Sequence, residues 1–146
     1  MRYLAIDLGD RRTGLALGDS VTGIASPCGL IEVPLERNGG EDLLLAIEKA
    51  ALRELGPAGS AGELVMGLPL NMDGSEGPAA TKIRLFAERV ARRTLRVVHV
   101  HDERLSTADA DERMSRSGLT RDQKKRRRDA IAAAGILRSF LSERAE

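Results

Sequence analysis

The chain has 146 residues and a mass of 15.7 kDa, a length typical of one domain. Hydrophobic residues make up 42% of it and charged residues 31%, with 23 basic and 22 acidic side chains giving a net charge of +1. This composition supports a sizeable core and excludes both wholesale disorder and a chain that is basic throughout. Nucleic acid stays open as a partner, because basic residues can still gather in one segment.

Cysteine and aromatic residues are scarce. The single cysteine, Cys28, excludes an intrachain disulfide framework and a zinc site built from several cysteines. Three aromatic residues leave little for a base-stacking surface of the single-strand-binding kind. No apolar run approaches the ~20 residues of a membrane span, and the N-terminus lacks a signal-peptide layout. We therefore expect a cytoplasmic protein with no membrane partner.

The hydrophobic pattern predicts strands first, then helices alternating with strands. Strands are expected at Tyr3–Ile6, at Thr13–Leu17, within Gly23–Val33 (broken around Pro27), at Leu64–Met66 and at Leu95–Val100. Helices are expected over Glu41–Leu55, from Pro78 onward, over Ser106–Met114 and from about Arg126 to Leu141. This order indicates an α/β fold: one domain over residues 1–146, with a mixed five-stranded sheet flanked by helices.

Three acidic residues stand at the ends of predicted elements. Asp7 ends the first strand, Glu103 follows the last strand, and Asp129 lies early in the final helix. Function in such sheets gathers at the carboxyl ends of strands, so the three carboxylates could converge there. Clustered carboxylates repel one another and suit Mg²⁺ or Mn²⁺, which can activate water against a phosphodiester. The alternative is that each acid is a turn former or a helix cap.

Two glycine-containing loops could approach phosphate or metal. They are the turn Asp7–Gly14 and the strand-to-helix loop Gly67–Pro78, in which Asn71 and Ser75 offer polar side chains for contact with a ligand. An ordinary hairpin and a helix-capping loop are the alternatives. The second loop also carries apolar residues, which indicate that part of it packs down: Leu68, Leu70 and Met72.

A basic run, Arg121–Arg128, adjoins Asp129 and could hold a polyanion beside the acids, although most charge runs are solvated helix faces. His99 and His101 share one strand face. Without a third nitrogen or sulfur ligand nearby in sequence, structural roles are favoured for them over a metal pair.

Four blocks of the sequence together resemble one family. Asp7–Gly14, Gly67–Pro78, Asp102–Thr107 and Asp129–Ala133 occur in the order and spacing of the YqgF/RuvX family, across nearly the whole chain. The long central block is highly specific. The resemblance implies an RNase H-like fold, related to the Holliday junction resolvase RuvC, and a metal-dependent nuclease.

The resemblance also implies site residues and a substrate. It assigns the catalytic and metal-binding roles to Asp7, Glu103 and Asp129, with Mg²⁺ or Mn²⁺ as cofactor. The family's usual substrate is the 5′ end of pre-16S rRNA, and the alternative is a resolvase cutting branched DNA. We expect a monomer or homodimer, with nucleic acid contacted by Arg11, Arg12, Asn71, Ser75, Arg104, Lys124, Lys125, Arg126 and Arg127.

Two residues depart from the family pattern. Asp10 adds an acid that could perturb metal binding, and Arg128 could pair with Asp129 and compete with the metal. Asp122 is the fallback third acid, seven residues before Asp129.

Two other functional classes remain open. A non-catalytic rRNA-binding assembly factor would need only the basic run and the loop. A nucleotide-binding protein of the kinase and actin-like type uses the same acid-glycine hairpin, but it needs two such domains and 146 residues are too few.

Overall fold

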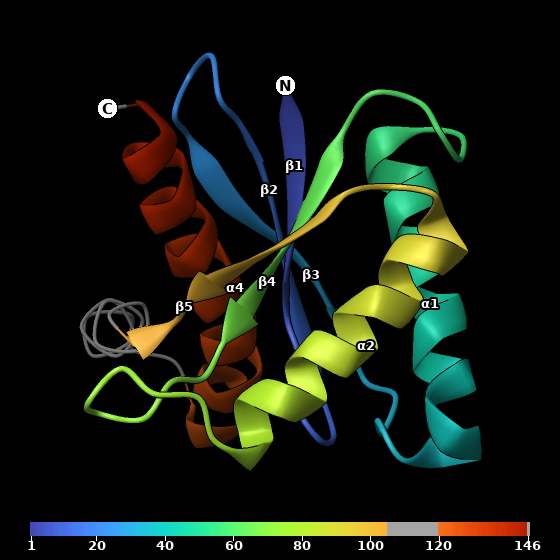
Figure 1. Cartoon of the computed structure of the whole chain (residues 1–146), viewed down its shortest axis with the longest axis vertical. Coiled ribbons are helices and arrows are strands. Elements are labelled where there is room, and N and C mark those ends of the chain that lie inside the picture. The colour runs from blue at the N-terminus through green and yellow to red at the C-terminus, as the bar shows by residue number, and fades with distance from the viewer. Residues whose placement is uncertain (105–119, 146) are drawn as a thin grey trace.

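The computed structural model describes residues 1–104 and 120–145, and Figure 1 shows their arrangement. The elements are β1 (Arg2–Asp7), β2 (Thr13–Asp19), β3 (Ala25–Ile31), α1 (Glu41–Leu55), β4 (Glu63–Leu68), α2 (Pro78–Thr94), β5 (Val98–Asp102) and α4 (Arg121–Ala145). A 3-10 turn at Arg37–Gly40 leads into α1. The helix expected over Ser106–Met114 lies outside the described residues. None of the helices in the described part has both the length and the apolar character to span a membrane.

The five strands form one mixed sheet in the order β3-β2-β1-β4-β5. Strand β2 runs antiparallel to both of its neighbours, whereas β1, β4 and β5 are parallel. The predicted mixed five-stranded sheet is therefore confirmed. Because β1 and β5 flank β4 in parallel, the residues that end these strands meet at one edge.

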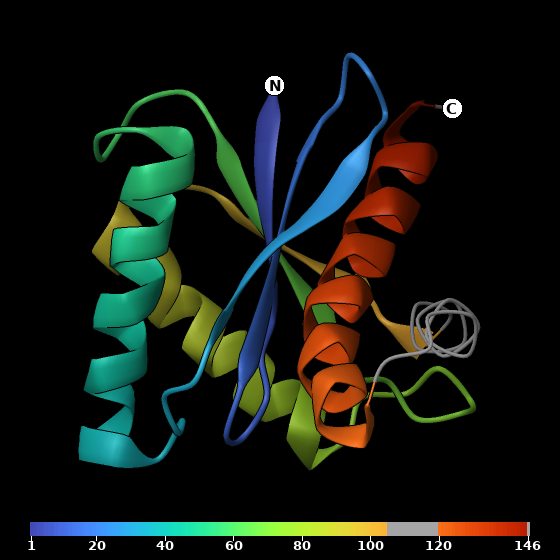
Figure 2. The same cartoon turned by 180° about the vertical axis from the view of Figure 1, so that it is seen from behind.

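The sheet separates two layers of helices. Helices α1 and α2 cover one face and α4 covers the other, as the two opposite views in Figures 1 and 2 show. Alternate residues of β1 follow this division: Leu4 and Ile6 pack with α1 and α2, and Tyr3 and Ala5 pack with α4. A strand that is buried on both faces has to be apolar on both, which explains the continuous run at its centre.

The predicted start of the last strand was wrong, for a reason that lies in tertiary contacts. The strand expected to start at Leu95 starts at Val98, because Leu95 caps α2 in the left-handed conformation and its N–H bonds Ala91. Arg96 then turns inward, is 7% exposed, and donates from its guanidinium to the carbonyls of the loop before β4: those of Gly56, Pro57, Ser60 and Gly62.

Strand β3 and helix α4 also differ from their predicted forms. Strand β3 runs through Pro27, which is tolerated because β3 pairs only with β2 and a register shift lies opposite, at Leu15 and Ala16. Helix α4 begins at Arg121 rather than about Arg126, so the basic run is helical.

The conformation of Leu95 gives a stability prediction. Its φ is 57° and its side chain is 68% exposed, so Leu95→Gly removes strain and little buried surface. We expect the free energy of unfolding to rise by about 0.5–1 kcal/mol in urea denaturation. The matched control is Leu85→Gly, an exposed position inside α2, which should lose about 1 kcal/mol. Equal losses in the two variants would contradict the strain at Leu95.

Candidate active site

Helix α4 lies very close to the sheet because small residues line their contact. A Cβ atom on Gly14 of β2 would overlap the backbone carbonyl of Asp129, and one on Gly18 would overlap the side chain of Leu137. The remaining contact is rich in buried alanine, with Ala5, Ala16, Ala133 and Ala134. Since Gly14 is the register partner of Asp7, this close approach brings Asp129 of α4 to the end of β1.

The three predicted acids converge at this edge. Burial, together with the negative charges of Glu103 and Asp129, raises the pKa of Asp7 from 3.8 to about 7. Burial also raises the pKa of Glu103. The protonated carboxyl of Asp7 donates a hydrogen bond to Glu103, so the two acids share one proton near neutral pH.

Two backbone features hold Glu103 in this place. It follows β5 directly, and its N–H donates to the carbonyl of Leu68 at the end of β4, at 3.3 Å. A Cβ on Gly67 would collide with the Glu103 carboxylate and with Ile136 of α4. The end of β4 thus leaves the space into which Glu103 and α4 both fit.

Arg12 supplies a partner for Asp129 that the sequence reasoning missed. Its Nε lies 3.9 Å from Oδ2 of Asp129, and both side chains are partly buried. Gly9 and Gly14 were predicted as points of close approach for phosphate or metal. The space beside each is instead filled by protein backbone, by the carbonyl of Arg12 beside Gly9 and by Asp129 beside Gly14.

Of the two residues that depart from the family pattern, Asp10 has its own partner outside the carboxyl pair. Asp10 is 84% exposed and its carboxylate lies 3.4 Å from Nζ of Lys82. Asp10 is not among the causes of the raised pKa of Asp7. Arg128 is exposed. The side chain of the fallback acid Asp122 lies outside the described residues, as do those of Lys124, Lys125, Arg126 and Arg127.

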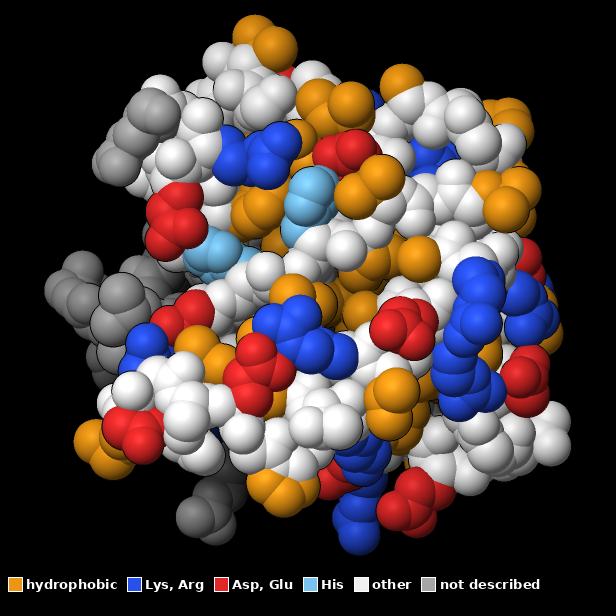
Figure 3. Space-filling model, viewed as in Figure 1, with side chains coloured by type: hydrophobic (Ala, Val, Ile, Leu, Met, Phe, Trp, Pro, Cys, Tyr) orange, Lys and Arg blue, Asp and Glu red, His pale blue; other side chains and the backbone are white. Residues whose placement is uncertain are grey.

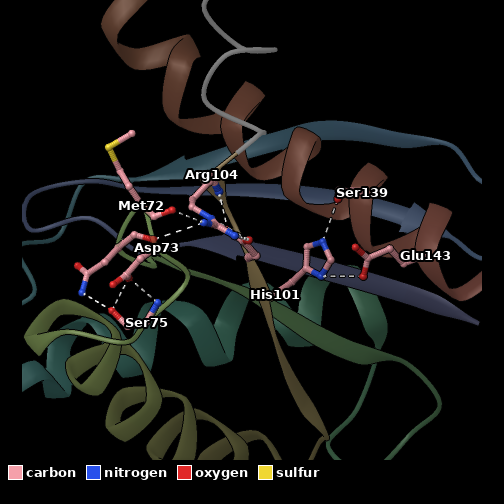
Figure 4. A network of polar contacts seen from close by, with 9 residues as sticks. Met72, Asp73, Ser75, His101, Arg104, Ser139 and Glu143 are labelled. Carbon is pink, nitrogen blue, oxygen red and sulfur yellow. Dashed lines mark hydrogen bonds and ion pairs between the residues drawn. The ribbon is translucent and has the colours of Figure 1, made fainter.

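The polar side chains of the loop Gly67–Pro78 form hydrogen bonds within the protein. Asn71 Nδ2 donates to Ser75 Oγ at 3.0 Å, and Ser75 Oγ donates to Asp73 at 2.6 Å. Arg104 donates to both carboxylate oxygens of Asp102. It also donates to the carbonyl of Met72, as Figure 4 shows. Their predicted contacts with nucleic acid remain predictions, but each of these side chains also holds the loop in shape.

An open depression of about 600 Å³ is lined in part by Arg12, the residue that contacts Asp129. It is lined on one side by the β1–β2 turn and on the other by the segment that leads into α1, and its residues are Asp10, Arg11, Arg12, Glu32, Pro34, Glu36 and Arg37. The predicted contacts Arg11 and Arg12 therefore share one surface with Arg37. Sequence reasoning missed Arg37 because no motif surrounds it.

The two histidines have structural contacts. The ring of His99 packs on Phe140 and its Nε2 lies 2.9 Å from Glu63. His101 also packs on Phe140, and its Nε2 lies 2.9 Å from Oγ of Ser139 on α4 (Figure 4). In the space-filling view of Figure 3 both histidine rings appear on the face of the molecule that carries β5.

The three acids lie at one edge of the sheet, but their side chains are not arranged as the ligands of a metal ion. Across the described residues, no group of three or more His, Cys, Asp or Glu side chains has the geometry to hold a metal ion. Asp7 and Glu103 are a hydrogen-bonded pair, and Asp129 is near enough to act on Asp7 by its charge.

Comparison with solved structures shows which fold the chain has. Two Holliday junction resolvases have the same fold over their full length. One is the fowlpox virus resolvase with its junction DNA, at a TM-score of 0.58, 13% identity and complete coverage of both chains. The other is Thermus thermophilus RuvC with its junction, at a TM-score of 0.55 and 12% identity, covering 99% of this chain and 96% of RuvC. The fold is therefore RNase H-like.

Sequence relatives identify the family. The family model described as "RuvX: Holliday junction resolvase" matches residues 1–143. A "Putative pre-16S rRNA nuclease" of Anaeromyxobacter sp. (strain Fw109-5) is 44% identical over 144 residues, 99% of this chain and 98% of the relative. A Salmonella dublin protein of the same description is 38% identical over 96% of this chain and 95% of its own length. The chain belongs to the RuvX family, and its class is that of a phosphodiester hydrolase, as the resemblance implied.

The close approach at Gly14 gives a second prediction. Gly14→Ala should lower the free energy of unfolding by about 2–3 kcal/mol, because its methyl group meets the backbone of α4 rather than a movable side chain. Gly29→Ala is the matched control in the neighbouring strand, since its new Cβ would meet Leu15 at an ordinary 3.8 Å. Urea denaturation measures both variants. Equal stability of the two would contradict the contact between β2 and α4.

The raised pKa of Asp7 gives a third prediction, for the protein without divalent metal. Between pH 4 and pH 7 the folded protein keeps a proton that the unfolded chain has released, so the free energy of unfolding falls as pH rises. Asp7→Asn should remove most of this fall and be more stable than wild type at pH 8 by about 2 kcal/mol.

Thermal unfolding in chelator from pH 4 to pH 8 measures this dependence. Asp73→Asn is the control: Ser75 lowers the pKa of Asp73 by hydrogen bonding, so its loss should leave the fall in place. Superimposable pH curves for wild type and Asp7→Asn would show that the Asp7 carboxyl is not held protonated.

Proposed function

We propose that the protein is a metal-dependent endonuclease that matures the 5′ end of pre-16S rRNA in the cytoplasm. The observation that carries the proposal is the convergence of Asp7, Glu103 and Asp129, whose repulsion helps to raise the pKa of Asp7. The names of the relatives at 38–44% identity support the rRNA substrate.

The residues present fit a divalent cation in kind. Asp7, Glu103 and Asp129 offer oxygen ligands only, which favours Mg²⁺ or Mn²⁺. When bound, such an ion activates water and stabilises the charge on the leaving oxygen. It would also relieve the repulsion between the acids, and the partly exposed contact of Asp129 with Arg12, at 3.9 Å, is too weak to hold that carboxylate away from it.

The other side chains of the site would bind and orient the substrate. Arg12 contacts Asp129 and also lines the open depression, where its guanidinium would face the substrate backbone. Arg11 and Arg37 extend this surface, and phosphates would lie there because arginine pairs with their oxygens. The basic run of α4 leads up to Asp129 and would lengthen the same path.

A Holliday junction resolvase is the second candidate. Two observations favour it: the description of the matching family, and the full-length likeness in fold to two resolvases. Cutting a symmetric four-way junction would require a homodimer with two sites, whereas rRNA maturation can use a monomer. A non-catalytic rRNA-binding factor is the third candidate, and the presence of all three acids disfavours it.

A cleavage assay tests the proposal and its alternatives together. A structured RNA with the 16S 5′ leader and a four-way DNA junction are incubated in parallel with Mg²⁺, Mn²⁺ or chelator. We expect the RNA alone to be cut, and Asp7→Asn to reduce the rate by more than roughly 100-fold, since a bound metal contributes several kcal/mol. Asp19→Asn, at an acid on the opposite end of the β1–β2 ladder from Asp7, is the control that should stay active.

Each other outcome contradicts the proposal in a different way. Symmetric nicking of the junction would identify a resolvase, and salt-sensitive binding without cleavage would identify a binding factor. Full activity of Asp7→Asn would refute the three-acid site. Metal binding is followed independently of activity by thermal unfolding: Mg²⁺ or Mn²⁺ should stabilise wild type more than Asp7→Asn.

A further inference from the structure

The loop Pro69–Gly77, between β4 and α2, is built as a rigid tip. A β-bridge joins Leu70 to Glu76, and Asn71 N–H donates to the Ser75 carbonyl at 2.9 Å. The carboxylate of Asp73 accepts hydrogen bonds from both the N–H and the hydroxyl of Ser75. A loop with this many internal bonds holds one shape without help from a ligand.

The same loop is anchored at its base and on its flank. Leu68 is buried in the core, and Leu70 packs against it. Arg84 of α2 binds the carboxylate of Glu76 through two bonds, at 2.6 and 2.8 Å. On the other side the guanidinium of Arg104 donates to the carbonyl of Met72 at 3.2 Å.

Met72 is the exception to this packing. We expected it to pack down with Leu68 and Leu70, and that expectation was wrong, because its side chain is 98% exposed. Figure 4 shows it pointing away from the polar network that holds its own backbone. Single exposed apolar side chains are common on protein surfaces, so exposure alone carries no function.

The position of Met72 provides the second observation. The loop follows Gly67, whose Cα lies against the carboxylate of Glu103, and the Met72 carbonyl is held by Arg104, the next residue after Glu103. The Met72 backbone is therefore tied to the residue that follows Glu103, and its loop begins beside the Glu103 carboxylate. A rigid support, an apolar tip and a nuclease site at the same edge of the sheet occur together.

The aromatic side chains of the chain are not available for contact with a base. All three aromatic residues are buried, with Tyr3 4%, Phe86 4% and Phe140 6% exposed, so none can stack on a nucleobase. Methionine is apolar and polarisable, and it is among the side chains that wedge between neighbouring bases. We infer that Met72 packs on the face of an unstacked nucleobase next to the phosphodiester that is cut.

This inference rests on the proposed nuclease function and adds to it a form of substrate recognition. The base would be one that has left its stack, at a step between duplex and single strand. Such a step costs least to open, and the nuclease would therefore favour a junction in structure over a particular base sequence.

The test uses structured RNAs that carry 2-aminopurine at successive nucleotides around the cleavage site, because this base becomes brighter when it unstacks. The protein is Asp7→Asn, which binds without cutting. We expect the fluorescence to rise roughly twofold at one position, Met72→Gln in the same background to lose that rise, and Met72→Leu to keep it. Val21→Ala is the control: Val21 is 86% exposed, on the β2–β3 turn at the far end of the sheet.

A kinetic measurement on proteins with Asp7 intact completes the test. Met72→Gln should lower kcat/KM about tenfold at unchanged thermal stability, and Met72→Leu should restore it. If Met72→Gln changes neither the rise in fluorescence nor the cleavage rate, the inference is overturned. The proposed nuclease function would still stand. Absence of both RNA binding and cleavage in the wild type would overturn the proposed function, and the inference with it.

Discussion

The close approach of α4 to β2 is the contact on which the candidate site depends. At Gly14 the backbone of the helix occupies the space where a side chain would lie, and the alanines and Gly18 continue this contact along the interface. Packing of this kind fixes both the height of the helix above the sheet and its rotation, because backbone atoms cannot move aside as side chains can. Asp129 is therefore held over the end of β1, beside Asp7.

The electrostatic consequence of this contact is that the protein holds acids together at a cost in stability. Asp7 is mostly buried, and at neutral pH it can ionise only against the charges of Glu103 and Asp129. The ion pairs on α1 and α2, such as Glu41 with Arg89 and Arg93, are exposed and contribute little in return. The repulsion between these acids lowers the stability of the fold, and a cation bound among them would restore it. Such an arrangement is typical of functional sites.

Local pattern predicted the elements well and their contacts less well. Strand β1 is apolar throughout because it is buried on both faces, and α1 has apolar residues at helical spacing because it is buried on one. The order of elements and the bounds of α1 could therefore be predicted. Asp7 and Glu103 could be placed at one edge because they end parallel strands. Asp129 was also singled out by its place early in the last helix, but that place could not fix its position, which depends on the contact at Gly14. The resemblance to a family gave this residue most of its support.

The errors share one physical cause. Leu95 and Arg96 carry β-forming neighbours, yet one caps a helix and the other binds carbonyls far away in sequence. The contact of Arg12 with Asp129 across the fold was missed as well, while its predicted contact with nucleic acid stays a prediction. In each case a contact between residues distant in sequence overrode the local preference, which no window of neighbouring residues can show.

The loop after β4 extends this argument to recognition. Polar side chains were predicted to be its ligand contacts because polar groups bind phosphates and bases in general. A loop at an active site must also hold its own shape, and in this one Asn71, Asp73 and Ser75 satisfy each other. The same network leaves the Met72 side chain outside, where it can make the contact with a base that we infer. Rigidity at the base and an apolar tip are thus two results of the same hydrogen bonds, and the preference for an opened base would follow from how the loop folds.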